Sequence, residues 1–176
     1  KVFVSRGIKV KMAEGFVSTP MVSYGTKHYG ASVGVVLTAS HNPPSYNGYK
    51  LKSEHGGPLI EELVKEVEAI IPDEHGMDLD AMSVENMIAE GQIEIVDLET
   101  LYVDAIIENF DLDAIKNSGL NFAYDAMYGA GQNVLKRIFP DMTFLHCDYN
   151  PSFMGQAPEP IHKNLGEFSE LIKSRG

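Results

Sequence analysis

The sequence predicts an α/β fold in which helices cover largely buried sheets. Short β-branched apolar runs, such as Val33 to Leu37, alternate along the chain with segments whose apolar residues recur at helical spacing. A continuous apolar run of this length is typical of a strand that is covered on both faces. Because strands that alternate with helices assemble into layers, we expect layered α/β/α domains with mixed sheets.

Local signals define the elements of the first half. Proline fits the first turn of a helix, so Thr19-Pro20 predicts a helix that ends at Gly30. After Pro58, apolar residues recur at helical spacing until Pro72 ends the helix. The other predicted elements are strands at 8–12, 33–37, 49–52 and 93–96 and a short helix at 84–89.

The second half begins at a predicted domain boundary. Apolar residues at helical spacing follow Asp97, and we expect this helix to connect two domains, residues 1–97 and 98–176. Asp111-Leu112-Asp113 is more simply explained as a helix cap with a first-turn acid than as a metal site. The remaining predictions are strands at 120–124 and 143–146 and helices at 132–139 and 165–172.

Composition argues against several classes of protein. The net charge of −11 opposes the phosphate backbone of nucleic acids, so we expect no nucleic-acid partner. The longest apolar runs are far shorter than the roughly 20 residues that cross a bilayer, so we expect no membrane span. Cys147 is the only cysteine, which excludes an intrachain disulfide and fits a cytoplasmic location.

Two glycine motifs have a functional and a structural interpretation. Gly30-Ala31-Ser32-Val33-Gly34 matches the nucleophile elbow G-x-S-x-G, but here a helix precedes the serine and a strand follows it, the reverse of the elbow. A helix end that leads into a strand is the simpler explanation. Gly129-Ala130-Gly131 is half of a dinucleotide fingerprint and is better explained as a tight turn, although a nearby phosphate stays possible.

The segment from Thr38 to Lys50 is the main candidate site. It follows a predicted strand, and ligands of open α/β sheets bind at the carboxyl ends of strands. In an extended loop the side chains of Ser40 and His41 diverge, which disfavours a Ser-His nucleophile pair. A phosphoryl group on the serine would instead find His41, Lys50, backbone N–H groups and a divalent metal. The alternative is an ordinary surface turn.

Two prolines and a predicted turn shape this loop. Pro43 and Pro44 restrict its backbone, and Asn47-Gly48 predicts a tight turn that returns Lys50 towards Ser40.

These residues resemble a known family. The strings TASHNP at 38–43 and YNGYK at 46–50 resemble the active-serine signature of the α-D-phosphohexomutase superfamily, in its phosphoglucomutase/phosphomannomutase branch. Thr19-Pro20 matches the Thr-Pro step upstream of that signature, and YDAMYGAG at 124–131 and PSFMGQAPEP at 151–160 resemble the second domain of the family. The similarity therefore extends over nearly the whole chain.

The resemblance implies a reaction and roles for individual residues. Ser40 would carry a phosphate that helps to bind Mg²⁺ and would pass it to a hexose monophosphate. The resulting 1,6-bisphosphate would reorient and return its other phosphate to Ser40, which interconverts 1-phospho and 6-phospho sugars. Glucose 1,6-bisphosphate would serve as activator and intermediate. His41 and Lys50 would transfer protons or hold the phosphate, with Lys50 the preferred acid/base group. Asn42 and Asn47 would contact the substrate.

The resemblance also implies that the chain is a fragment of a cytoplasmic enzyme. Residues 1–97 would be the C-terminal part of domain one, and residues 98–176 the N-terminal part of domain two, ending before the metal-binding loop. The partners would be the hexose phosphate and the remaining domains, and the fragment alone would be inactive. The alternatives are a stand-alone phosphosugar-binding module and, less favoured, a serine hydrolase that uses Ser32.

Overall fold

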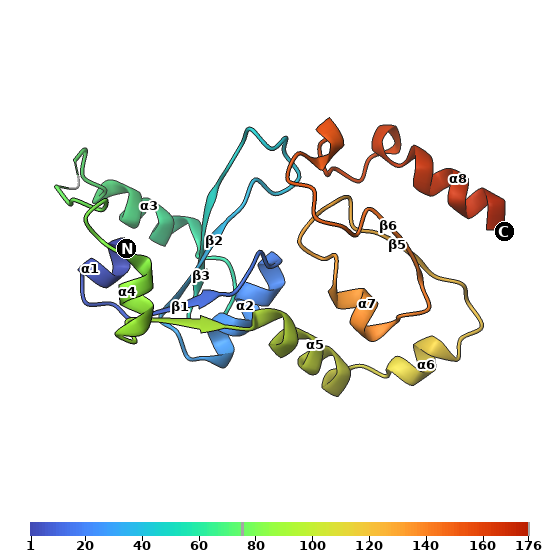
Figure 1. Ribbon diagram of the computed structural model, residues 1–176, viewed down its shortest axis with the longest axis horizontal. Coiled ribbons are helices and arrows are strands. Elements are labelled where there is room, and N and C mark those ends of the chain that lie inside the picture. The colour runs from blue at the N-terminus through green and yellow to red at the C-terminus, as the bar shows by residue number, and fades with distance from the viewer. Residues whose placement is uncertain (75, 176) are drawn as a thin grey trace.

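The fold is mixed α/β, as the sequence predicts. A computed structural model describes residues 1–74 and 76–175. Figure 1 shows two halves, with the first half in blue to green and the second in yellow to red. The elements of the first half are α1 (Val2–Ser5), β1 (Val10–Ala13), α2 (Thr19–His28), β2 (Val33–Leu37), β3 (Tyr49–Ser53), α3 (Glu61–Ala69), α4 (Val84–Ala89) and β4 (Ile93–Val96).

The second half has shorter strands and two helical turns that the sequence did not predict. Its elements are α5 (Leu98–Asn109), α6 (Leu112–Lys116), β5 (Ala123–Asp125), α7 (Val134–Ile138), β6 (Thr143–Leu145) and α8 (Gly166–Arg175), with 3₁₀ turns at Phe153–Gly155 and His162–Asn164. Asp111 caps α6, since its Oδ1 accepts a hydrogen bond of 2.9 Å from the Ala114 amide. The predicted helix cap is therefore confirmed. None of the described helices is long and apolar enough to span a membrane.

The described strands form three pairs. β1 and β4 are parallel, as are β5 and β6, whereas β2 and β3 form an antiparallel hairpin. In the hairpin Val36 lies opposite Lys50 and Leu37 lies opposite Tyr49. Each of the three described sheets is therefore either parallel or antiparallel, and none of them combines the two arrangements.

β2 has the predicted bounds but is covered on one face only. Gly34 and Val36 are buried on the face towards α2, whereas Leu37 on the opposite face is 68% exposed. The apolar run predicted cover on both faces. The difference arises because the described segments place a helix against one face of the hairpin alone.

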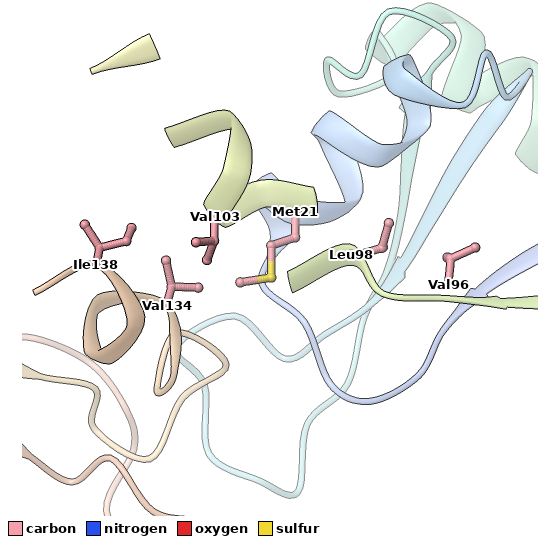
Figure 2. Close-up of a cluster of buried hydrophobic side chains, with 6 residues drawn as sticks. All are labelled: Met21, Val96, Leu98, Val103, Val134 and Ile138. Carbon is pink, nitrogen blue, oxygen red and sulfur yellow. The ribbon is translucent and has the colours of Figure 1, made fainter. Parts of the chain in front are cut away.

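The main hydrophobic core crosses the predicted domain boundary. Figure 2 shows Met21 of α2 facing side chains of α5 and α7. Asp97, the predicted boundary, caps α5 by accepting a hydrogen bond of 2.8 Å from the Thr100 amide. Hydrogen bonds from the side chain and backbone of Thr100 lower the pKa of Asp97. The buried residues of this core are Met21, Val96, Leu98, Val103, Val134 and Ile138.

Gly34 determines how closely β2 approaches α2. A Cβ at this position would lie 2.1 Å from Thr26 Oγ1, and Thr26 is itself buried and donates a hydrogen bond to the Val22 carbonyl. We expect Gly34→Ala to destabilise the chain by about 1–3 kcal/mol through overpacking, measured by urea unfolding. Gly15→Ala is the matched control because a Cβ there meets nothing within 4 Å. Equal unfolding midpoints for the two variants would contradict this account of the packing.

Candidate active site

Residues 38–48 form a loop that joins β2 to β3. The Thr38 amide donates a hydrogen bond of 3.0 Å to the Gly48 carbonyl and closes the base of the loop. Lys50 lies next to this base, opposite Val36. The hairpin thus returns Lys50 to β2, the strand that leads into the Ser40 loop, although no hydrogen bond joins the two side chains among the described residues.

The turns of this loop lie earlier in the chain than the sequence predicts. The Asn42 amide bonds to the Ala39 carbonyl at 3.0 Å, and the Tyr46 amide bonds to the Pro43 carbonyl at 2.9 Å. The predicted tight turn at Asn47-Gly48 is wrong, because Gly48 pairs with Thr38 at the loop base instead. A Cβ on Gly48 would lie 2.8 Å from the Thr38 carbonyl oxygen, so close pairing there requires glycine.

Ser40 and His41 are in contact, contrary to the expectation from sequence. Ser40 has φ of 58°, which is the left-handed region, and its Oγ lies 3.3 Å from His41 Nδ1. The expected divergence of the two side chains is wrong because it assumed an extended backbone. The geometry therefore allows a proton to pass between the serine hydroxyl and the imidazole.

This contact does not complete a hydrolase triad. A triad needs a third group that orients the histidine, usually a carboxylate. Among the described residues no carboxylate pairs with His41, and both Ser40 and His41 are exposed. Ser32, the serine of the G-x-S-x-G motif, lies between the end of α2 and the start of β2, as the simpler explanation of that motif predicts.

The two asparagines predicted to bind substrate help to shape the loop. Asn42 donates a side-chain hydrogen bond of 3.0 Å to the Ala39 carbonyl. Asn47 Oδ1 accepts a hydrogen bond of 2.9 Å from the Gly48 amide. Both residues are exposed on the loop that carries Ser40, so their substrate contacts stay a prediction.

The described residues do not form a complete metal site. No group of three or more histidine, cysteine or acidic side chains among them could hold a metal ion. Ser40, through a phosphate, is the single ligand that the sequence predicts. Magnesium bound to that phosphate would need further oxygen ligands.

A second polar cluster, which the sequence did not predict, lies at the carboxyl ends of β5 and β6. His146 Nδ1 is 2.8 Å from Asp125 Oδ1, and His146 Nε2 is 3.2 Å from Glu167 Oε2 on α8. The side chain of Asp125 is almost fully buried, and it also accepts a hydrogen bond from the Met127 amide. The available signal was that Asp125 directly follows the strand predicted at 120–124 and that His146 ends the strand predicted at 143–146.

We predict that the contribution of this cluster to stability depends on pH. Burial lowers the pKa of His146, but hydrogen bonds and charge from Asp125 and Glu167 outweigh burial and raise it above 6.5. The charged imidazole therefore contributes stability at pH below 6.5, and this contribution is lost as the pH rises through the raised pKa.

We expect an NMR titration to show a pKa above 6.5 for His146 and a lower value in Asp125→Asn. A Glu170→Gln control, on the same helix as Glu167, should leave the titration unchanged. An unaltered pKa in Asp125→Asn would contradict the assignment.

Comparison with known proteins identifies the family. Residues 1–76 match the model of the phosphoglucomutase/phosphomannomutase alpha/beta/alpha domain I, and residues 100–176 match that of domain II. The chain belongs to the phosphoglucomutase/phosphomannomutase family. This membership confirms the resemblance read from the active-serine signature. It also agrees with the predicted α/β/α class, which both domain descriptions carry.

Several members of this family are similar over most of the chain. A probable phosphoglucosamine mutase of Methanothermobacter thermautotrophicus is 32% identical over 92% of the chain and 35% of its own length. A phosphoglucomutase/phosphomannomutase of Thermococcus kodakarensis has the same identity and the same coverage of both chains. A phosphoglucomutase of Komagataeibacter xylinus is 29% identical over 87% of the chain and 30% of its own length.

A solved structure of a family member is also similar to this chain. A putative phosphomannomutase from Thermus thermophilus has a TM-score of 0.80 at 35% identity and covers 94% of this chain and 37% of its own. The chain therefore spans about a third of the length of the family members it matches.

Proposed function

We propose that the chain is part of a phosphohexomutase that interconverts hexose 1-phosphates and 6-phosphates through a phosphoserine at Ser40. The observation that carries this proposal is the Ser40 loop of a family member, in which the serine oxygen lies 3.3 Å from His41 Nδ1. The residues that would complete a metal site and a sugar-binding site lie outside the chain in this proposal. The family relatives, whose lengths exceed the chain about threefold, support that part of it.

The transfer step needs no reactant other than the phosphoserine and the hexose monophosphate. A hydroxyl oxygen of the hexose monophosphate attacks the phosphorus of phosphoserine and loses its proton, and the bond between phosphorus and Ser40 Oγ breaks. The serine oxygen takes up a proton, and the sugar becomes a 1,6-bisphosphate. After the sugar reorients, the reverse step returns its other phosphate to Ser40, so the net reaction is an isomerisation.

The loop residues would contribute positioning and proton transfer. His41 contacts Ser40 Oγ and is therefore placed to hold the proton that the serine oxygen gains and loses. Lys50, at the base of the same loop, is proposed to serve the sugar hydroxyl and to neutralise phosphate charge. Mg²⁺, when bound to the phosphate on Ser40, would stabilise charge on the transferred group.

The test is an activity assay on the full-length protein that contains this chain. With Mg²⁺ and catalytic glucose 1,6-bisphosphate, we expect glucose 1-phosphate or mannose 1-phosphate to be converted to its 6-phosphate. Glucosamine 1-phosphate belongs in the panel because a probable phosphoglucosamine mutase is among the relatives. Binding of hexose phosphate without conversion would favour the phosphosugar-binding module instead. If the protein neither binds nor converts hexose phosphate, both proposals are rejected.

A further inference from the structure

The conformation of Ser40 needs a local support. Within the loop at 38–48, Ser40 is the one non-glycine residue with a positive φ among those described. L-residues avoid this region because the Cβ crowds the backbone, so they adopt it where neighbouring groups hold them there. In Ser40 this conformation is also what turns Oγ towards His41.

Thr38 supplies the support. Its Oγ1 accepts a hydrogen bond of 3.0 Å from the Ser40 amide and so bridges the residue between them. Thr38 is itself fixed, because its amide bonds to the Gly48 carbonyl at 3.0 Å and its own carbonyl packs closely against Gly48. It is also partly buried, whereas Ser40 is exposed. The hydroxyl that holds Ser40 is therefore anchored on the β2–β3 hairpin.

We propose that Thr38 is a positioning residue whose hydroxyl oxygen holds Ser40 in the left-handed conformation and keeps Ser40 Oγ beside His41. The inference rests on the proposed function for its kinetic consequences. Among the described hydrogen bonds, Thr38 bonds to the Ser40 amide and not to the serine oxygen, so it acts through the Ser40 backbone. Its removal should therefore slow phosphoryl transfer and leave the binding of hexose phosphate largely unchanged.

The test compares two variants of the full-length protein. Thr38→Val has almost the same shape but no acceptor, and we expect it to lower kcat by about 10-fold to 100-fold with KM within about twofold. Thr38→Ser retains the oxygen, and we expect kcat within about threefold of the parent. Ser45→Ala, a change elsewhere in the same exposed loop, is the control and should have the parental kcat. The proposal fails if Thr38→Val has the parental kcat or if Thr38→Ser is impaired as much as Thr38→Val.

A measurement on the unaltered protein covers the case in which Thr38→Val does not fold. The Ser40 amide donates to a partly buried acceptor, so its hydrogen exchange should be slower than that of an unbonded loop amide. Exchange at the unprotected rate would overturn the proposal whatever the variants do. If Ser40 never takes phosphate from glucose 1,6-bisphosphate, the proposed function fails, and the amide exchange still tests the contact with Thr38.

Discussion

Ser40→Ala in the full-length protein is expected to abolish the interconversion of hexose 1-phosphates and 6-phosphates. The variant has no oxygen to carry the phosphoryl group between the two half-reactions. Loss of a covalent nucleophile removes the pathway itself and not one contribution to it, so kcat should fall by at least about 10³-fold. The measurement is a coupled assay of 6-phosphate formation with glucose 1,6-bisphosphate present.

Ser32→Ala is the matched control because the two serines belong to competing explanations. The phosphohexomutase proposal predicts parental activity for this variant, since Ser32 lies at the opposite end of β2 from the Ser40 loop. A hydrolase built on the G-x-S-x-G motif predicts the reverse pattern, with Ser32 essential and Ser40 dispensable. An active Ser40→Ala enzyme would exclude the phosphoserine mechanism.

Met21→Ala is expected to have the largest effect on stability. Met21 is 1% exposed, and it packs in the core that joins α2 to α5 and α7 (Figure 2). Truncation would leave a cavity at the junction of the two halves and lower the free energy of unfolding by about 2–5 kcal/mol. Urea unfolding of the 176-residue chain followed by circular dichroism measures this change.

The same substitution at an exposed methionine controls for the chemistry of the change. Met154 is 71% exposed, so Met154→Ala should alter the unfolding free energy by less than about 0.5 kcal/mol. If the two variants unfold at the same urea concentration, Met21 does not belong to a shared core. The halves would then be held together by the chain connection at Asp97 and not by packing.

Sequence patterns predicted the elements whose signals are local. β2, α4 and β4 have the predicted bounds, since β-branched runs and a capping serine mark them directly. The predicted strand at 120–124 is instead found at Ala123–Asp125, and Leu120 is 67% exposed. Apolar character alone did not indicate which of these residues pair with β6, because pairing depends on residues distant in the sequence.

The candidate site shows the same division between local and distant determinants. The motif located Ser40, His41 and Lys50 on one hairpin, and the structure places Ser40 and His41 on its loop and Lys50 on β3 beside the loop base. It did not predict the contact between Ser40 and His41, because a serine in the left-handed region is set by Thr38 and the loop base and not by its own preference. The Asp125–His146 pair was missed because Asp125 ends β5 and His146 follows β6, so the two meet only when these strands pair.

The location of phosphate on the full-length protein tests the central claim most directly. After incubation with glucose 1,6-bisphosphate, peptide mass spectrometry should find one phosphate on Ser40 in the peptide that spans the TASHNP string. Subsequent addition of hexose monophosphate should remove it. An unmodified Ser40 in a preparation that still interconverts hexose phosphates would contradict the mechanism.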